Sequence, residues 1–248
     1  MKQRLDSELT KRGLVPTRSQ AESWIKMGKV LVDGRVATKG GIMVGNRSVI
    51  TITSEDRYVS RAGHKLASVS AMLRLDFKDK IVLDVGSSTG GFTDYALQNG
   101  AKKVYAVDVG TEQLHPSLRR DRRIELHEKT DIRDFVPSET PDIVLVDVSF
   151  ISLRDILPSI RIILQSSIYN PKSTTLIIAM VKPQFEAGAK QVSKGVIKND
   201  TMRRDILKDF EIWAKSLFVI IDKADSEVAG AKGNSERFYK LKPNNLFT

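Results

Sequence analysis

Cysteine is absent from the 248-residue chain, which excludes disulfide bonds, thiolate metal sites and cysteine nucleophiles. Histidine is scarce as well: His64, His115 and His127 are too few and too scattered to predict a zinc site. Long apolar runs are also missing. The longest, residues 176–181 and 217–221, fall far short of the roughly 20 residues that a membrane-spanning helix needs. The first residues contain no apolar stretch of the signal-peptide type, so we expect a cytoplasmic protein without metal or membrane insertion.

Positive charge is in excess over the whole chain. There are 40 Lys and Arg residues against 30 Asp and Glu, which gives a net charge of +10. The excess is densest near the N-terminus, because residues 1–60 carry 11 basic and 6 acidic side chains, whereas residues 61–248 carry 29 and 24. A basic segment joined to a larger, less charged one favours a polyanionic partner, chiefly nucleic acid.

The N-terminal segment has the pattern of a small α+β domain. Apolar residues at helical spacing predict helices over 4–12 and 18–28, with Thr17 or Ser19 as the N-cap of the second. We expect short strands over 29–32, 35–36 and 49–52, a hairpin turn at Asp33-Gly34, and another turn over 44–47. The polar stretch 53–60 is the predicted linker, and we place the boundary between domains 1–57 and 58–248.

The remainder alternates between strands and helices after a predicted helix over 60–75. This alternation predicts an α/β fold with a mostly parallel sheet and helices on both faces. The expected helices cover 91–99, 112–120, 152–165 and 199–215. The expected strands cover 81–85, 104–107, 124–126, 143–147, 176–181, 218–221 and 238–241.

A glycine-rich turn follows the strand 81–85 and leads into a helix. It is not a P-loop, because no Gly-Lys-Ser/Thr follows, and Ser88 stands where a pyrophosphate-binding loop needs its second glycine. The turn therefore suits a nucleoside ligand without pyrophosphate, such as S-adenosylmethionine. Its candidate cofactor-binding residues are Asp84, Gly86, Ser88, Gly90, Gly91 and Phe92.

Two further carboxylates are candidates for the same ligand. Asp108 ends the second strand of the sheet, where a carboxylate can accept both ribose hydroxyls. Asp131 follows the third strand, where a contact with the adenine edge is needed, but it could equally cap a helix. The sequence leaves both roles open for Asp131.

Long motifs in both segments resemble known families. Residues 1–57 resemble the S4-like RNA-binding domain, and residues 60–242 resemble the FtsJ-like ribose methyltransferases. The combination looks like the TlyA family, also known as hemolysin A. The motifs that carry the resemblance lie at 4–6, 19–21, 25–30 and 32–34 in the first segment, and at 60–66, 84–92, 146–153, 181–186 and 233–236 in the second.

The resemblance implies a Rossmann-like methyltransferase fold with a seven-stranded sheet. It also implies S-adenosylmethionine-dependent 2'-O-methylation of ribosomal RNA, with cytidine as the target by analogy, on free RNA or on ribosomal subunits. FtsJ-like enzymes use a Lys-Asp-Lys-Glu tetrad, and the matching positions are Lys65, Asp147, Lys182 and Glu236.

A ribose 2'-hydroxyl is a weak acid, so the implied reaction needs a side chain that assists its attack on the methyl group. Lys182 ends a predicted buried strand just before Pro183, so it is placed at the carboxyl edge of the sheet. Either a neutral Lys182 accepts the proton, or a charged Lys182 orients the hydroxyl while the proton leaves late. Lys65 would favour loss of a proton from Lys182, whereas Asp147 and Glu236 would oppose it. The sequence does not decide which effect is larger.

Several other side chains have two interpretations. Phe150 could stack on a flipped-out base, but a place in the core is the favoured prediction. Trp24 is predicted in the small core, and His64 on a partly exposed helix face. In the N-terminal segment, basic residues on or next to the predicted helices are candidates for RNA phosphate contacts: Arg4, Arg18, Lys26 and Lys29.

Two rival functions remain. The name hemolysin suggests a membrane-damaging protein, but the sequence has neither a span nor a long amphipathic segment with aromatic anchors. A non-catalytic, RNA-binding assembly factor that keeps a dead methyltransferase fold is the other rival. The intact glycine-rich loop and the four tetrad positions argue against it.

Overall fold

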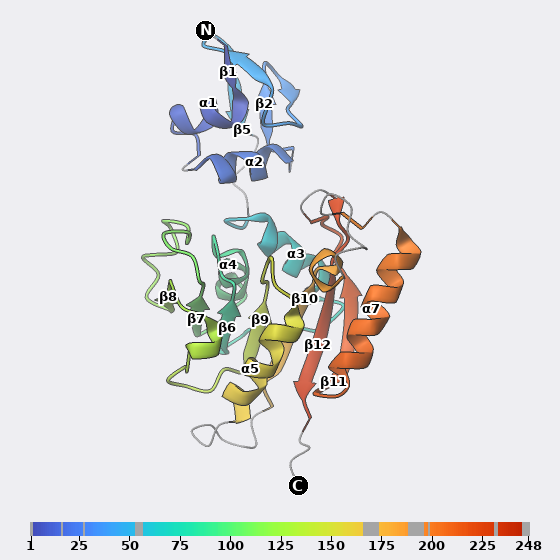
Figure 1. Cartoon of the computed structure of the whole chain (residues 1–248). Coiled ribbons are helices and arrows are strands. Elements are labelled where there is room, and N and C mark those ends of the chain that lie inside the picture. The colour runs from blue at the N-terminus through green and yellow to red at the C-terminus, as the bar shows by residue number, and fades with distance from the viewer. Residues whose placement is uncertain are drawn as a thin grey trace. The chain divides into compact units, whose positions relative to one another are not determined.

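The computed structural model describes residues 2–15, 17–26, 28–52, 57–165, 174–187, 196–197, 199–230 and 233–244. These residues form two compact units, 1–61 and 62–248 (Figure 1). Of the predicted linker, residues 53–56 lie outside the described part. The boundary at residue 57 stays a prediction.

The N-terminal unit packs two helices against short strands. Helices α1 (Leu5–Lys11) and α2 (Arg18–Lys26) contact each other, and Thr17 Oγ1 accepts a hydrogen bond from the Gln20 amide at 3.2 Å, which confirms Thr17 as the N-cap. Trp24 is partly buried against the small core. The strands are β1 (Lys2–Arg4) paired with β4 (Met43–Gly45), and β2 (Val30–Val32) paired with β3 (Arg35–Val36) and β5 (Ile50–Ile52).

The second unit contains a seven-stranded sheet in the order β11-β12-β10-β9-β6-β7-β8. Only β12 runs antiparallel to its neighbours, so the mostly parallel α/β sheet expected from the alternation is confirmed. The strands are β6 (Ile81–Val85), β7 (Lys103–Val107), β8 (Ile124–His127), β9 (Ile143–Val146), β10 (Leu176–Val181), β11 (Phe218–Asp225) and β12 (Arg237–Pro243).

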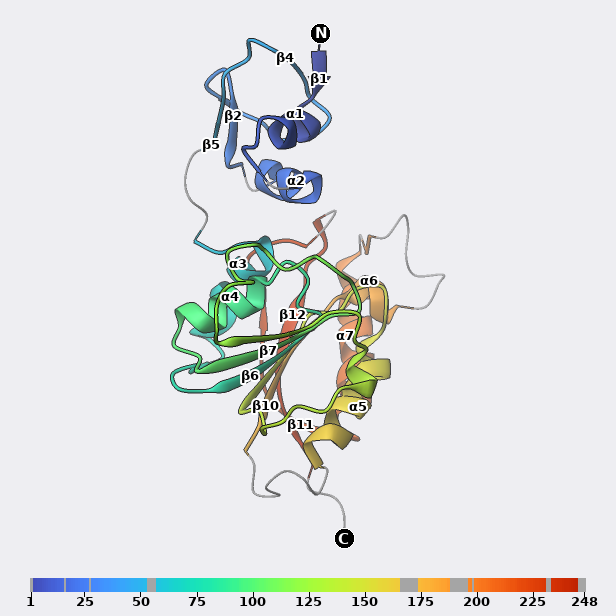
Figure 2. The same cartoon turned by 90° about the vertical axis from the view of Figure 1, so that its left-hand side faces the viewer.

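Helices cover both faces of this sheet. Figure 2 shows α3 (Arg61–Ser70) and α4 (Gly91–Gln98) on one side, with α5 (Leu153–Gln165) and α7 (Asp200–Ala214) on the other. Two shorter helices, α6 (Pro183–Glu186) and the 3-10 turn η1 (Ile132–Asp134), follow β10 and β8. Apolar side chains of α5, α7 and the central strands form one buried cluster, which holds the strand ends in place.

The prediction of a helix over 112–120 is wrong, because the structure has only bends and turns there. Pro116 lacks an amide donor and disfavours helical geometry at the residue before it, so Leu114 and Leu118 are buried without a helix. They pack against the glycine-rich loop. A Cβ added to Gly90, whose φ is +90°, would meet Leu118 Cδ1 at 2.5 Å and Leu114 Cδ1 at 2.7 Å. Gly90 thus serves loop packing.

The described residues lack two further features. They include no helix that is long and apolar enough to cross a membrane. They include no cluster of three or more His, Cys, Asp and Glu side chains that could hold a metal ion.

Candidate active site

The carboxyl ends of β6, β7, β9 and β10 meet at one edge of the sheet, since these strands are parallel neighbours. A cavity of about 530 Å³ lies beside this edge, a size typical of small-molecule sites. The candidate cofactor residues that line it are Gly86, Ser88, Asp108 and Asp131. The lining also includes apolar residues, among them Val109, Ile132, Val148, Ile151 and Ile156.

The glycine-rich loop contributes backbone to this cavity. Gly86 has a φ of +81°, and a Cβ there would lie 2.7 Å from the Asp147 carbonyl oxygen, so only glycine fits between the two strand ends. Ser88 also adopts a positive φ of 46°. Gly90 and Gly91 lie outside the lining. Phe92 is buried against Phe238, with ring centroids 5.9 Å apart, and is a core residue.

Asp84 does not reach the cavity. Its carboxylate is 1% exposed and accepts hydrogen bonds from the Thr93 amide at 2.9 Å and the Thr93 hydroxyl at 2.6 Å. Burial raises the pKa of Asp84 to about 7. The side chain therefore anchors the first turn of α4 beneath the loop, and any part in ligand binding would be indirect.

Asp108 is placed as a ligand acceptor would be. It follows β7, lines the cavity, and accepts hydrogen bonds from the Ser88 amide at 2.8 Å and the Gly110 amide at 2.7 Å. These two donors fix the carboxylate and leave further lone pairs on both oxygens. The structure thus offers a preorganised acceptor at the position expected for a ribose.

Asp131 performs one of the two roles that the sequence left open. It is the N-cap of η1 and accepts from the Arg133 amide at 2.9 Å, so the helix-cap interpretation is confirmed. The Arg133 guanidinium pairs with the same carboxylate and lowers its pKa. Both side chains line the cavity, so contact with an adenine edge stays a prediction.

The four tetrad positions form two ion pairs. Lys182 Nζ lies 2.6 Å from Asp147 Oδ1, and Lys65 Nζ lies 2.5 Å from Glu236 Oε2. Lys65, Lys182 and Glu236 are buried, and the Asp147 side chain is 15% exposed. Strand register brings the pairs together, because β10 lies between β9 and β12 and Val181 pairs with Arg237.

Ser149 was missed as an individual residue by the sequence analysis. Its Oγ accepts a hydrogen bond from Lys182 Nζ at 2.6 Å, and the residue also lines the cavity. The only signal in the sequence is its position two residues after Asp147, inside a motif that was otherwise recognised. Asp147 and Ser149, which both line the cavity, thus hold Lys182, which is not itself part of the lining.

Phe150 is not a core residue, and the favoured prediction was wrong. Its side chain is 92% exposed, its φ is +67°, and it lines the cavity next to Phe185, with ring centroids 5.3 Å apart. An apolar side chain on a short loop can face either way, and apolarity alone favoured burial. The stacking role thus becomes the better interpretation.

Comparisons with known proteins agree with this geometry. The FtsJ-like methyltransferase family matches residues 58–242, and the S4 domain matches residues 3–49. The "16S/23S rRNA (cytidine-2'-O)-methyltransferase TlyA" of Mycobacterium tuberculosis is 35% identical, over 96% of this chain and 89% of its own. The chain belongs to the TlyA/hemolysin A family of FtsJ-like methyltransferases.

Other members of the TlyA family are similarly close. The "Putative rRNA methyltransferase YqxC" of Bacillus subtilis is 41% identical, over 95% of this chain and 84% of its own. A solved structure, "Putative hemolysin from Streptococcus thermophilus", has a TM-score of 0.75 and 37% identity, covering 98% of this chain and 89% of its own. The resemblance drawn from the sequence motifs is therefore confirmed.

The S4 unit of this TlyA-family chain gives its four candidate basic residues different surroundings. Arg4 and Arg18 both pair with Asp6, at 2.6 and 3.1 Å, and the Asp6 side chain is fully buried. Its hydrogen bond with Arg4 holds the pKa of Asp6 down at about 2. Lys26 is exposed and Lys29 half-buried. Arg4 and Arg18 thus carry part of the unit's own stability, whatever they do with RNA.

Proposed function

We propose that the protein transfers a methyl group from S-adenosylmethionine to a ribose 2'-hydroxyl of ribosomal RNA, with cytidine as the target. The observation that carries this proposal is the pairing of Lys182 with Asp147, which lines the cavity, and of Lys65 with Glu236 at the same end of the sheet. The TlyA relatives are named for the same reaction, and an S4 domain precedes the methyltransferase domain. A ribosomal substrate also implies a cytoplasmic protein.

The cavity fits S-adenosylmethionine by its chemistry. Among the described residues, the carboxylates Asp108, Asp131 and Asp147 line it together with apolar side chains, and Arg133 is the only lysine or arginine in the lining. Such a lining suits a nucleoside that carries a positive sulfonium and no phosphate. When bound, S-adenosylmethionine supplies an electrophilic methyl group. Asp108 would hold the ribose, and the backbone of Gly86 would allow close approach of the ligand.

Lys182 is arranged to orient the attacking hydroxyl. A lysine ammonium has three N–H donors, and contacts with Asp147 and Ser149 occupy two of them. The third remains for the ribose 2'-oxygen. We infer that Lys182 orients a lone pair of that oxygen toward the methyl group. The O–C bond would form as the S–C bond breaks. The hydroxyl proton would leave to solvent late in this step.

The proposed activity is tested by mapping ribose methylation. Ribosomal RNA from cells with and without the active gene is digested and analysed by mass spectrometry. We expect 2'-O-methylcytidine at one or more positions only when the protein is active, and restoration by the purified protein with S-adenosylmethionine. Identical methylation maps, with no transfer in vitro to RNA or to subunits, would contradict the proposal.

Cofactor affinity is expected to depend on Asp108. Asp108→Ala removes the acceptor and leaves ligand hydroxyls unpaired, which costs on the order of 1–3 kcal/mol, or about 5- to 150-fold in Kd. Asp108→Asn keeps one oxygen and should lose less. Calorimetric titration with S-adenosylmethionine measures both. An unchanged Kd for the alanine variant, with an unchanged melting temperature, would rule out this role.

RNA affinity is expected to depend on Lys26 and Lys29, which can be changed without disturbing the buried Asp6. The double variant Lys26→Gln/Lys29→Gln should bind RNA more weakly and show a salt dependence flatter by about one unit of slope per lost phosphate contact. Affinity for S-adenosylmethionine should barely move. The matched control, Lys208→Gln/Lys215→Gln on or beside α7, changes the net charge equally. Equal losses in both variants would show a general charge effect instead of an S4-domain contact.

A further inference from the structure

A polar network lies on the opposite face of β12 from the Lys65–Glu236 pair. Side chains alternate along β12: Phe238 packs on Phe92 of α4, whereas Tyr239 contacts Phe210 of α7. Glu236 shares the face of Phe238, and Arg237 shares the face of Tyr239. Arg237 therefore lies on the α7 side of this strand, next to the tetrad residue Glu236 in the chain, and it does not line the cavity.

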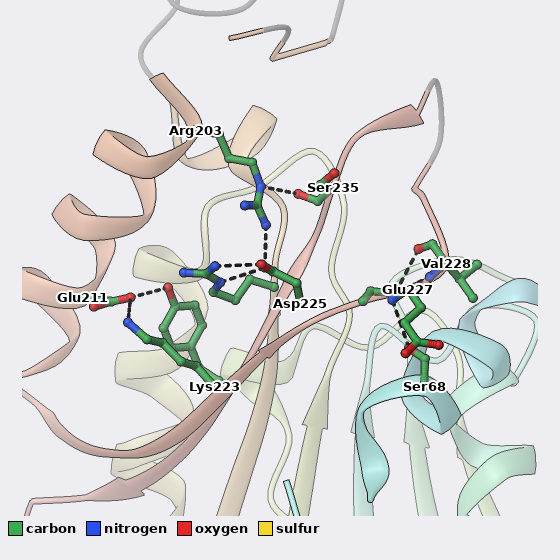
Figure 3. Close-up of polar contacts among 11 residues, drawn as sticks. Ser68, Arg203, Glu211, Lys223, Asp225, Glu227, Val228 and Ser235 are labelled. Atoms are coloured by element: carbon green, nitrogen blue, oxygen red, sulfur yellow. Dashed lines mark hydrogen bonds and ion pairs between the residues drawn. The ribbon is translucent and has the colours of Figure 1, made fainter. Parts of the chain in front are cut away.

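Asp225, the last residue of β11, joins these groups (Figure 3). Its carboxylate accepts two hydrogen bonds from Arg237, both at 2.8 Å, and a third from Arg203 Nη2 at 2.5 Å. Arg203 Nε also donates to the Ser235 carbonyl oxygen at 3.1 Å. Asp225 thus ties down the residues immediately before and after Glu236. The hydrogen bond with Arg237 lowers the pKa of Asp225, so its carboxylate stays charged.

The residues after Asp225 contact Glu236 directly and reach Lys65 through Ser68. The Ser226 amide donates to the Glu236 carbonyl oxygen at 3.0 Å. The Glu227 amide donates to Ser68 Oγ at 3.4 Å, and Ser68 Oγ donates to the Lys65 carbonyl oxygen at 2.7 Å (Figure 3). Residues 225–227 therefore connect the strand that carries Glu236 with the helix that carries Lys65.

The carboxylate of Glu236 has little freedom to adjust. Glu236 is 2% exposed, and Gly230 lies against it so closely that an added Cβ would meet Glu236 Oε1 at 2.2 Å. A small shift of the backbone at residues 235–237 would therefore move the carboxylate relative to Lys65 or force it against Gly230. Interiors packed this tightly transmit displacement instead of absorbing it.

We propose that Asp225 is a positioning residue for methyl transfer, which sets the geometry of the Lys65–Glu236 pair through Arg203 and Arg237. The proposal rests on the proposed function, because it assigns Asp225 to the same tetrad. Asp225 touches neither the cavity nor Lys65. In the described part of the chain, its side chain contacts Arg203 and Arg237, which hold the residues on either side of Glu236, and this arrangement makes the proposal testable.

The first test compares Asp225→Asn with Lys223→Ala. Lys223 lies on the same strand and the same face two residues earlier, and it pairs with Glu211 at 2.7 Å without contacting residues 235–237 (Figure 3). We expect Asp225→Asn to lower the single-turnover rate at saturating cofactor and RNA by about 10-fold, as misplacement of a reacting group does, with the Kd for S-adenosylmethionine unchanged. Lys223→Ala should stay within about twofold of the unmodified protein.

The second test repeats Asp225→Asn in a Glu236→Gln background. If Asp225 acts through Glu236, its substitution should change the already lowered rate by less than about twofold. An equal loss in both backgrounds would overturn the proposal, as would a wild-type rate in the single variant. Failure of the unmodified protein to methylate ribosomal RNA would instead contradict the proposed function, so the two failures are distinguishable.

Discussion

Replacing Lys182 by alanine is expected to reduce the single-turnover rate of methylation by roughly 100-fold or more, the usual range for losing a positioned proton acceptor or orienting group. Lys182 is buried and is held by two residues of the cavity lining, Asp147 and Ser149, both at 2.6 Å. The variant should retain its affinity for S-adenosylmethionine, because the loop and Asp108 are untouched. A single-turnover time course of RNA or subunit methylation at saturating cofactor, with samples quenched at set times, measures the rate.

Two further variants sharpen this result. Lys182→Arg should not restore the rate, because the planar guanidinium has a different reach and a different donor geometry. Ser149→Ala removes one of the two contacts of Lys182 and should lower the rate by a smaller factor than Lys182→Ala. If Lys182→Ala turns over within a few-fold of the unmodified protein, Lys182 is a structural lysine and the mechanism is wrong.

Replacing Phe150 by alanine is expected to lower kcat/KM by about 5- to 150-fold, since stacking of a base on an aromatic ring contributes about 1–3 kcal/mol. The side chain is 92% exposed beside the cavity, where a flipped-out base would be presented. Phe150→Tyr keeps an aromatic face and should retain most of the activity. Steady-state kinetics with ribosomal subunits measures both variants.

The backbone at Phe150 gives an independent readout. A φ of +67° is strained for phenylalanine, and glycine relieves such strain by roughly 1 kcal/mol. Phe150→Gly should therefore be at least as stable as the unmodified protein and yet be impaired like Phe150→Ala. Loss of stability in parallel with activity would show that the ring serves packing, most directly against Phe185.

The pattern of apolar residues was sufficient to predict the strands of the larger unit. All seven strands were expected, because parallel strands buried on both faces are short apolar runs such as Ile143–Val146 and Leu176–Val181. Consecutive strands tend to pair, and the pairing of β9 with β10 brings Asp147 and Lys182 together. Local chemistry likewise marked the Thr17 cap and the Asp33-Gly34 turn, where φ is positive at both residues.

Polar elements at the edge of the sheet were harder to delimit. The strand expected over 218–221 extends to Asp225. The prediction was too short because residues 222–225 are mostly charged and resemble a loop. Their role depends on β12 lying between β10 and β11, an order that a local pattern does not contain. The contact between Asp225 and Arg237 is therefore a property of the sheet and not of either segment.

The sequence by itself determined the residue types at the strand ends, the glycines at positive φ and the family to which the chain belongs. Only the tertiary structure decided which way side chains face. It turned Asp84 inward to Thr93, left Phe150 in solvent, and joined Lys65 to Glu236 across 171 positions of the chain. The reason is physical: spacing along a chain sets local geometry, whereas burial and partner choice depend on the packing of elements that are distant in sequence.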